Sequence, residues 1–452
     1  MKVSRYTSIV RNVGACGQHL LYHWLSQGMA VVDEALANAL TTAAGVPQDG
    51  IPRSLQRQLV DLGVLLEDGA SERQEVERWY RRVQADTTTF SVTVLTTYAC
   101  NLRCTYCVEQ GVKGPVALTA ERAARVAAWV QERVLALGSQ GLDVTFYGGE
   151  PLLNLEGLEV VAGELSRFAR QRGLTLGTSV TTNGVLLDRQ AALRLAAVGV
   201  EAASVTLDGD APVHDARRPF PDGRGSFQTV VANLEAAAGI LQVYITGNVQ
   251  AHTVAAVPRL LDCLEARGLA RRLAGWHFGA TSAPAVTGFT EAGHRSPASP
   301  GRGCRGAGAE GGCAKDFGGE LVALNRELLR RGLPRRRMAG LSVCTLNRGP
   351  AAVIIDPLGR LYKCPALVGH AQFSIGDIFR GGASAEAFAP YPEEEERCLD
   401  CRWFPVCTGG CRFLSFLETG DLRHTHCSRG LYERYGEEML RLDYEATCQE
   451  QV

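Results

Sequence analysis

The most informative stretch of the sequence is TYACNLRCTYC, residues 97–107, which directly follows the strand-like run Ser91–Thr96. Its thiols, Cys100, Cys104 and Cys107, have the spacing C-x3-C-x2-C. Three thiolates on one short loop suit one face of an iron–sulfur cube. They leave one iron open to a substrate's amino and carboxylate groups, whereas four thiolates complete a [4Fe–4S] cluster. A zinc site that borrows a distant ligand is the alternative.

Strand-like and helix-like segments alternate around this loop. Strands are expected at Ser91–Thr96, Leu142–Tyr147, Thr175–Thr181, Ala202–Leu207, Gln242–Val249 and Trp276–Ala280, and amphipathic helices at Thr119–Leu137, Leu155–Arg172, Asp188–Ala197, Phe227–Ala238 and Ala255–Arg267. Such alternation predicts parallel strands with right-handed crossovers. Because a closed barrel has eight such units, we predict an α/β fold with an open, partial (β/α)6 TIM-like barrel.

Further motifs follow the next three strands, at the edge where such barrels carry their chemistry. They are GGEP (Gly148, Gly149, Glu150, Pro151), TTNG with Asn183, TLDG with Thr206, and HDARR ending at Arg218. Alone, GGEP is most often a turn. The carboxylates Asp208 and Asp215 in the last two motifs also suit helix caps. The interpretation therefore depends on the motifs occurring together.

Together these motifs resemble the radical SAM superfamily, whose signature CxxxCxxC carries an aromatic residue, here Tyr106, before the last cysteine. The resemblance implies a [4Fe–4S] cluster on Cys100, Cys104 and Cys107, and S-adenosylmethionine held by Tyr106, Gly148, Gly149, Glu150, Pro151, Asn183, Thr206 and Arg218. It also implies reductive cleavage of that cofactor to a 5′-deoxyadenosyl radical, which abstracts hydrogen from the substrate. No catalytic residue beyond the cluster is identified.

A second group of cysteines lies near the C-terminus, at Cys344, Cys364, Cys398, Cys401, Cys407, Cys411 and Cys427. An isolated C-x2-C pair there would suggest zinc. The seven positions together resemble the SPASM extension, which usually holds two auxiliary [4Fe–4S] clusters. The resemblance implies an outer cluster on Cys398, Cys401, Cys407 and Cys427, and an inner cluster on Cys344, Cys364 and Cys411.

Two positions depart from the sulfatase-maturing relatives of that extension. Where those enzymes have an extra cysteine, this chain has Met338. The inner cluster therefore either keeps an open iron, which would suit a substrate thiolate, or is completed by Cys304 or Cys313. Where they have an aspartate proposed to take the substrate proton, this chain has Pro365. That difference favours peptide modification over formylglycine formation.

The N-terminal region carries folded-protein patterns without a cysteine cluster. Leu20–Trp24, Val31–Leu40 and Leu55–Leu66 have helical or mixed apolar patterns, and Glu72–Val83 predicts a charged connecting helix. The region resembles the N-terminal part of ribosomal-peptide maturases. There a small α+β, winged-helix-like module grips the leader of a precursor peptide through a strand edge. The alternative is a cap that completes the partial barrel.

We divide the chain into four regions. They are an N-terminal recognition or cap module (1–88), the radical SAM partial barrel (89–285), a flexible Gly/Pro-rich insertion and linker (286–340), and the SPASM auxiliary-cluster domain (341–452). The arginines at 330–331 and 335–337 form one basic cluster. Such a cluster suits a solvated helix end or an acidic peptide partner.

The bulk composition narrows the partners and the compartment. With 452 residues, a formal net charge of −1 and no long apolar run, the chain is expected to bind neither nucleic acid nor a membrane. The 15 cysteines and the absence of a secretion signal favour metal binding in a reducing cytoplasm.

The sequence therefore predicts a radical SAM/SPASM oxidoreductase that matures a ribosomally synthesised peptide (a RiPP) by a thioether or other crosslink, or by oxidation. It would use S-adenosylmethionine and three [4Fe–4S] clusters, one of which binds that cofactor while two are auxiliary. The expected partners are a precursor peptide with a leader and a flavodoxin- or ferredoxin-type reductant. The enzymatic alternatives are sulfatase-maturase-type protein oxidation and small-molecule dehydrogenation, and the non-enzymatic alternative is an iron–sulfur electron carrier.

Overall fold

A computed structural model describes residues 1–14, 17–41, 51–280, 317–341, 343–380 and 398–450. The chain forms two compact units. One comprises Ala85–Arg336 and Thr345–Pro390, and the other comprises Met1–Gln84, Arg337–Cys344 and Tyr391–Val452. Most of the predicted insertion, including Cys304 and Cys313, lies outside the described residues. No helix in the described ranges is long and apolar enough to cross a membrane.

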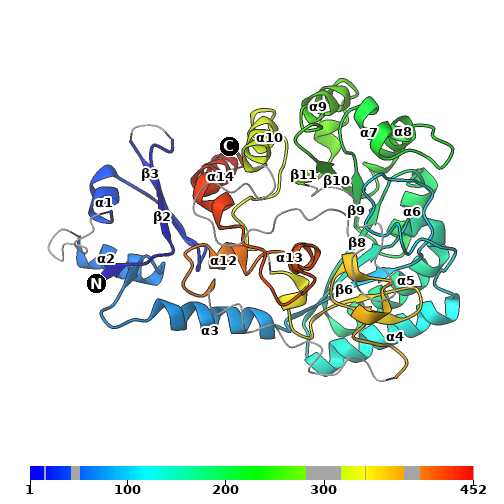
Figure 1. The fold of residues 1–452 in the computed structure, drawn as a ribbon, viewed down its shortest axis with the longest axis horizontal. Coiled ribbons are helices and arrows are strands. Elements are labelled where there is room, and N and C mark those ends of the chain that lie inside the picture. Colours follow the sequence, from blue (N-terminus) through cyan, green and yellow to red (C-terminus); the bar gives the residue numbers. More distant parts are fainter. Residues whose placement is uncertain (15–16, 42–50, 281–316, 342, 381–397, 451–452) are drawn as a thin grey trace. The chain divides into compact units, whose positions relative to one another are not determined.

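The first unit contains the predicted partial barrel. Its parallel strands are β6 (Thr89–Leu95), β7 (Gly141–Tyr147), β8 (Thr175–Thr182), β9 (Ala202–Thr206), β10 (Gln242–Val249) and β11 (Gly275–Ala280), adjacent in that order. The helices that join them are α4 (Ala120–Leu137), α5 (Leu155–Arg172), α6 (Arg189–Ala197), α7 (Ala211–Arg217), α8 (Phe227–Ala237) and α9 (Ala256–Ala266), which cover one face of the sheet (Figure 1). The predicted α/β fold class is confirmed.

Local signals set the limits of these helices. Thr119 precedes α4, and its hydroxyl accepts a hydrogen bond from the Arg122 amide at 3.2 Å. The helix ends at Gly138, whose φ of 65° is the left-handed conformation that glycine adopts without strain. Asp188 caps α6 in the same way as Thr119 caps α4. The predicted helix limits were therefore accurate to within one or two residues.

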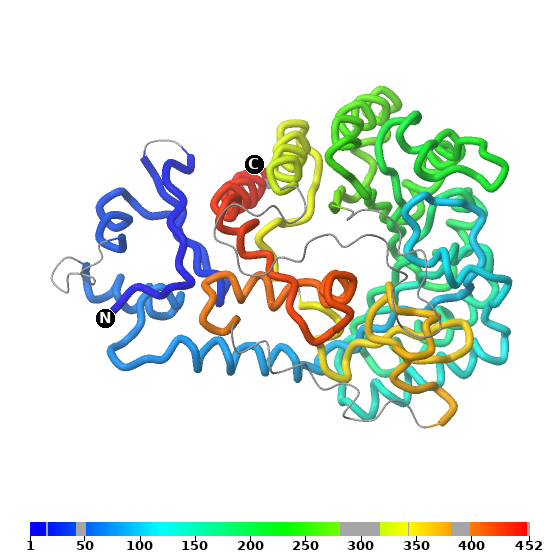
Figure 2. Tube along the Cα trace, in the orientation of Figure 1, coloured from blue at the N-terminus to red at the C-terminus, as the bar shows by residue number. Residues whose placement is uncertain are grey.

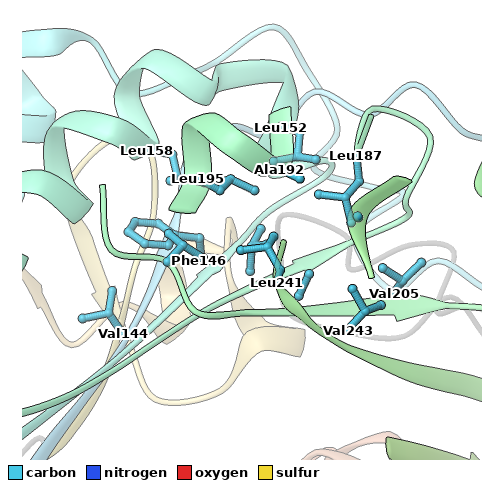
Figure 3. Close-up of a cluster of buried hydrophobic side chains, with 14 of the residues drawn as sticks. Val144, Phe146, Leu152, Leu158, Leu187, Ala192, Leu195, Val205, Leu241 and Val243 are labelled. Atoms are coloured by element: carbon cyan, nitrogen blue, oxygen red, sulfur yellow. The ribbon is translucent and has the colours of Figure 1, made fainter. Parts of the chain in front are cut away.

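The two faces of the barrel sheet differ in chemistry because successive side chains of a strand alternate. Figure 3 shows Phe146 of β7 and Val243 of β10 among apolar side chains that include Leu158 of α5, and all three are fully buried. Each such side chain contributes about 1.5–3 kcal/mol to stability. The opposite face is polar and only half-buried, as at Thr145 and Ser179, whose hydroxyl oxygens lie 3.3 Å apart. The polar inner face of the barrel is therefore partly accessible to solvent.

A C-terminal hairpin extends the barrel sheet. β12 (Ala352–Ile355) pairs in parallel with β6, and β13 (Arg360–Tyr362) and β14 (Gly376–Asp377) follow in antiparallel order. The sheet therefore has nine strands among the described residues, and the hairpin comes from the region that the sequence division placed in the auxiliary-cluster domain. Short 3-10 turns lie at Pro151–Asn154, Ala270–Arg272, Thr345–Asn347, Pro365–Leu367 and Ala371–Phe373.

Residues 317–336 belong to the barrel unit. Residues that the sequence division placed in the linker form α10 (Gly318–Arg330). The neighbouring Arg331 forms ion pairs with Asp262 and Glu265 of α9 and with Glu327 of α10. Arg331 thus lies at the end of α10, but with 10% of its side chain exposed it is paired within the unit rather than solvated.

The second unit begins with a small α+β module. It contains β1 (Lys2–Val3) paired with β5 (Leu65–Leu66), the antiparallel sheet β2 (Thr7–Val10), β3 (His19–His23) and β4 (Met29–Val32), and the helices α1 (Glu34–Ala39), α2 (Arg53–Asp61) and α3 (Glu72–Ala85). The segment Leu20–Trp24, given a helical or mixed pattern from sequence, is mainly the central strand β3. Glu72–Val83 is the predicted helix, observed as α3.

The C-terminal residues of this unit form α12 (Phe404–Cys407), α13 (Arg412–Thr419) and α14 (Arg429–Glu450). Of these, α12 and α14 share one apolar core with the N-terminal module. Trp24 contacts Trp403 at 5.2 Å between ring centroids, and Tyr80 contacts Phe404 at 4.9 Å, both edge to face. The two ends of the chain therefore fold together.

Candidate functional site

The cysteine loop leaves the carboxyl end of β6 and is anchored to the loop that follows α7. The Arg103 amide donates to the Pro219 carbonyl and the Thr105 amide donates to the Arg217 carbonyl, both at 2.9 Å. The ammonium of Lys113 donates to the Leu102 carbonyl at 3.0 Å. Backbone hydrogen bonds therefore fix the loop at several points, independently of any bound group.

The thiols of the loop are half-buried beside a cation. Burial raises the pKa of Cys100 to about 11, opposed by the charge of Lys113 and by the Leu102 amide, which donates to the sulfur. Burial also raises the pKa of Cys107, opposed by Lys113 and by the Glu109 amide. Amide donors and a nearby cation stabilise thiolate ligands, as an iron–sulfur cluster requires.

The glycines of GGEP pack against the cysteine loop. The Gly149 amide donates to the Thr97 carbonyl at 3.0 Å, and the Glu150 amide donates to the Ala99 carbonyl at 2.8 Å. A Cβ on Gly148 would overlap the Thr97 carbonyl, and one on Gly149 would overlap the Ala99 carbonyl. Gly148 also has a φ of 140°. Both residues must be glycine for the end of β7 to lie against this loop.

Glu150 is fully buried and joins three segments. Its carboxylate accepts hydrogen bonds from the Thr182 hydroxyl at 2.7 Å, the Asn183 amide at 2.8 Å and the Leu152 amide at 3.1 Å. The Asn183 side chain donates to Asn101 of the cysteine loop at 2.7 Å. Burial raises the pKa of Glu150, opposed by these hydrogen bonds. The carboxylate thus ties the end of β8 to the end of β7.

Tyr106 and Arg218, predicted to contact the cofactor, meet directly. Arg218 Nη1 donates to the Tyr106 hydroxyl at 2.6 Å, and that hydroxyl donates to Asp208 Oδ2 at 2.5 Å. Burial lowers the pKa of Arg218, but Cys104, Tyr106 and Asp208 outweigh it, so the pKa is raised. Its Nε is buried without a hydrogen-bond partner among the described residues. A cation with a free buried donor suits a carboxylate ligand.

Sequence reasoning missed three residues of this network, Asp208, Arg217 and Asn248. Asp208 Oδ1 accepts the Asn248 amide at 2.9 Å, so the suggestion that Asp208 caps a helix is wrong. The Arg217 Nε lies 3.3 Å from Asp208 Oδ2, and its guanidinium covers the Tyr106 ring at 4.5 Å. Asn248 is the last residue but one of β10, so the strand-end rule that found the other motifs extends to it.

The remaining residues of the HDARR motif have structural roles. Burial lowers the pKa of His214 to about 3, and its Nε2 lies 3.1 Å from the Ser226 hydroxyl. Asp215 lies within α7 rather than at a helix start, and its Oδ1 accepts the amide of Phe227, the first residue of α8, at 2.8 Å. Among the other predicted residues, Thr206 lies on the inner face beside Thr246.

The four outer thiols lie near one another in the second unit. Burial raises the pKa of Cys398 to about 12, and Cys407, Cys401 and Cys427 raise it further, opposed by the guanidinium of Arg412. Burial also raises the pKa of Cys407, opposed by hydrogen bonds from the Ser428 and Gly409 amides. The structure therefore brings together the four cysteines assigned to the outer cluster.

The inner set is divided between the two units. Cys344 lies close enough to Cys411 to raise its pKa, after the larger effect of burial, whereas Cys364 belongs to the barrel unit. Which cysteines hold the inner cluster therefore stays a prediction. Across the described ranges, no three His, Cys, Asp or Glu side chains are gathered closely enough to hold a single metal ion. A [4Fe–4S] cluster does not require that spacing, because each cysteine binds a different iron.

Several known proteins are similar to this chain. Residues 94–249 match the family model of the Radical SAM superfamily. The mycofactocin maturase MftC of Mycobacterium ulcerans is 27% identical over 340 residues, which cover 71% of this chain and 82% of that protein. The GTP 3′,8-cyclase of Rhodococcus opacus is 33% identical over 172 residues, 37% of this chain and 46% of that protein.

Solved structures show the same fold. Native anSMEcpe with bound AdoMet matches with a TM-score of 0.59 at 19% identity, over 79% of this chain and 99% of that chain. SuiB of Streptococcus suis bound to S-adenosylmethionine matches with a TM-score of 0.50 at 13% identity, over 95% and 99%. The family match runs from the end of β6 through β10, the strands whose ends carry the cysteine loop and its neighbours. Residues 94–249 therefore form a radical SAM domain, and the chain is an enzyme whose cofactors are S-adenosylmethionine and a [4Fe–4S] cluster.

Proposed function

We propose that this enzyme modifies a ribosomally made precursor peptide by abstracting a hydrogen atom from it. The observation that carries the proposal is a combination of three features in one chain. They are the cofactor residues at the carboxyl ends of the barrel strands, a second group of neighbouring thiols, and a small module with an unpaired strand edge. The similarity to MftC, which is named a maturase, extends over 82% of that protein. A further anSMEcpe structure of the same fold contains both AdoMet and a peptide.

The residues at the barrel edge have distinct roles in this proposal. Cys100, Cys104 and Cys107 would hold the cluster that binds S-adenosylmethionine, and Arg218 would take the cofactor's carboxylate. When bound, cluster and cofactor together supply the 5′-deoxyadenosyl radical. The side chains of Tyr106, Asp208 and Asn248 keep Arg218 in place, while Gly148, Gly149, Glu150, Pro151, Asn183 and Thr206 would line the rest of the cofactor site.

The inner face of the barrel sheet is the proposed binding site of the peptide. Thr93, Thr145, Ser179 and Ser204 share this face by strand register, and all four are half-buried. Hydroxyl groups both donate and accept hydrogen bonds, so they suit a peptide backbone, which offers both partners. The face leads to the strand ends that carry the cofactor residues.

The outer thiols would hold one auxiliary cluster and the inner thiols a second, as in the SPASM extension. Pro365 directly follows Cys364 and begins a 3-10 turn, so no carboxylate stands at that position. This departure favours peptide crosslinking or oxidation over formylglycine formation. Oxygen-sensitive clusters also favour a cytoplasmic location and a flavodoxin- or ferredoxin-type electron donor.

The leader would bind to β4. In the described part of the module, β4 pairs with β3 alone, and its Met29 and Val31 are 38% and 44% exposed. A pocket beside this strand is lined by Leu20, Tyr22, Gln27, Met29, Arg337, Ala339, Gly340, Leu440, Asp443 and Tyr444. An open edge supplies backbone hydrogen bonds to an added strand, and a neighbouring pocket supplies side-chain specificity.

The main test uses anaerobically reconstituted enzyme, dithionite, S-adenosylmethionine and short peptides encoded beside the gene. We expect 5′-deoxyadenosine to form, a mass change in one peptide, and deuterium to move from labelled peptide into 5′-deoxyadenosine. The Cys104→Ala variant should form no 5′-deoxyadenosine. Cofactor cleavage accompanied by conversion of a sulfatase or a small molecule, with every peptide unchanged, would replace this proposal with an alternative.

Leader binding has its own test. The Val31→Asp variant should weaken binding of a fluorescent leader peptide at least tenfold, because it places a charge on the proposed docking edge. The matched control is Arg53→Asp on the exposed start of α2, which should bind normally. Equal affinities for Val31→Asp and the parent enzyme would exclude β4 as the docking strand.

A further inference from the structure

The loop that carries Cys398 and Cys401 is held by the first eighty residues of the chain. We propose that Arg5, Tyr6 and Trp24 are positioning residues for the outer auxiliary cluster, because they fix the backbone between and after these cysteines. The proposal rests on the assignment of the outer thiols under the proposed function. It gives the N-terminal module a second role besides binding the leader.

Hydrogen bonds hold the two residues between the cysteines. The Tyr6 hydroxyl donates to the Leu399 carbonyl at 3.2 Å, and Arg5 Nη1 donates to the Asp400 carbonyl at 3.2 Å. The Asp400 carboxylate pairs with Arg5 at 3.5 Å and with Arg73 of α3 at 2.5 Å. In Figure 2 the orange segment near residue 400 passes beside the blue N-terminal strands. Both carbonyls of the C-x2-C turn are thus engaged by N-terminal side chains.

The residue after the second cysteine is anchored in the same way. Arg402 Nη2 donates to the Thr7 carbonyl at 3.2 Å and to the Ser8 hydroxyl at 3.1 Å. Ser8 also accepts a hydrogen bond from the indole of Trp24 at 2.9 Å. Strand β2 and the end of β3 therefore contact the loop through one shared network.

Aromatic packing completes the support. Trp24 is 1% exposed and meets the ring of Trp403, which is 4% exposed. The helix α12 that follows, ending at Cys407, has only four residues. So short a helix is not stable alone, because nucleation costs more than one turn returns. Its conformation must come from the core that it shares with the N-terminal module.

The need for external support follows from the loop's small size and high charge. Fixing the backbone of one residue costs about 1–2 kcal/mol, and the thiolates repel one another when the ligand set assembles. Within the C-x2-C turn, the backbone supplies a hydrogen bond from the Cys401 amide to the Cys398 carbonyl at 2.8 Å. The N-terminal contacts offset the remaining cost by ordering the loop before iron binds.

The test uses full-length enzyme reconstituted with iron and sulfide. The variant combines Tyr6→Phe with Arg5→Gln, and the matched control is Arg81→Gln, which breaks the Arg81–Glu77 ion pair on the same module without touching the loop. We expect iron to fall from about twelve to about eight per chain, with selective loss or shift of one auxiliary-cluster signal in redox-titrated EPR spectra. Uncoupled formation of 5′-deoxyadenosine should change less than twofold.

Three further variants separate the possible failures. Arg5→Lys with native Tyr6 should restore iron and the EPR signal, as expected for positioning through a hydrogen bond and charge. If the double variant loses its near-UV circular dichroism, Tyr6→Phe alone, which keeps the ring in the core, decides by the EPR signal. Full iron content and unchanged auxiliary-cluster EPR spectra in the Tyr6→Phe variant would overturn the proposal. If instead Cys401→Ala itself leaves all three signals intact, the outer-cluster assignment fails, and the proposed function needs revision.

Discussion

The barrel's cysteine loop and the outer cysteine loop are fixed by different parts of the chain. Cys100, Cys104 and Cys107 lie on one loop whose supports are neighbouring segments of the barrel, such as Gly149 after β7 and Pro219 after α7. Cys398 and Cys401 lie on a loop whose supports come from residues up to 395 positions away in sequence, as for Arg5 and Asp400. A parallel sheet supplies its own rigid edge, whereas a short cysteine-rich segment obtains its rigidity from another part of the fold.

Cations accompany both sets of thiols, but in different surroundings. Lys113 opposes the rise in the pKa of Cys100 and Cys107 from within the same loop. Arg412, which opposes it at Cys398, is fully buried and donates to the Arg423 carbonyl at 2.8 Å. A buried guanidinium is worth more to an anionic cluster than a partly solvated ammonium, because the local dielectric is lower.

The largest expected effects come from one methyl group added at each site. Gly149→Ala places a Cβ on the Ala99 carbonyl, and Gly410→Ala places one on the His426 carbonyl. The loop must move to make room for this Cβ, and a displacement of about 1 Å at a reactive site lowers the reaction rate about a hundredfold. We therefore expect Gly149→Ala to lower uncoupled 5′-deoxyadenosine formation by that factor. Gly410→Ala should spare it and abolish peptide modification with loss of one auxiliary signal.

The control for both is Gly163→Ala, since a Cβ there meets nothing within 4 Å on α5. It should keep activity and, if anything, stabilise the helix by about 0.5–1 kcal/mol. Equal loss of uncoupled cleavage in Gly149→Ala and Gly410→Ala would show that the two sites are not independently supported.

The difference between the two sites also explains what sequence could predict. The barrel strands alternate apolar and polar residues and end in motif residues, so both the fold and the cysteine loop were predictable. Strand β3 was missed because all five residues of His19–His23 are buried, which removes the alternation. Asp208 was misread and Asn248 missed because only the pairing of β9 with β10 brings them together. The supports of Cys398 were beyond prediction, since no local signal links residues 5 and 400.

A smaller effect is expected within the barrel site from Asp208→Asn. The change removes the charge that accepts from Tyr106 and pairs with Arg217. A buried hydrogen bond to a charged group is worth about 1.5–3 kcal/mol, so the KM for S-adenosylmethionine should rise about 10–100-fold. Asp222→Asn, an exposed pair with Arg224, is the control and should be neutral. If the KM is unchanged and only stability falls, the network supports the fold but not the cofactor.

Lowering the pH should weaken the second unit through His23. Burial lowers its pKa to about 4, opposed by the charge of Glu72, and its ring nitrogens lie 3.3 Å from the Ser26 amide and 3.1 Å from the Ser4 hydroxyl. Below pH 6.5 the unfolded chain binds a proton that the folded chain excludes, so stability falls as pH drops from about 6.5 to about 4. At pH 5 the loss is about 2 kcal/mol.

The measurement is thermal unfolding of the full chain between pH 7.5 and 5, followed by tryptophan fluorescence. His23→Gln, which keeps a polar side chain without the titration, should flatten the pH dependence of the transition that reports Trp24. A His23→Gln profile as steep as that of the parent would assign the acid sensitivity to another group, such as His214 in the barrel unit, whose pKa is lowered to about 3.

The smallest expected effect separates peptide binding from cofactor cleavage on the barrel's inner face. Ser179→Ala removes one hydroxyl whose oxygen lies 3.3 Å from that of Thr145. A single neutral hydrogen bond is worth about 0.5–1.5 kcal/mol, so the KM for the peptide should rise about threefold to tenfold, and uncoupled cleavage should not change. Val31→Asp on β4 should weaken the proposed leader binding through the other unit. The two effects should therefore multiply in a double variant, because the sites lie on separate parts of the chain. A double variant no worse than Val31→Asp alone would mean that the peptide does not reach Ser179 on the inner face.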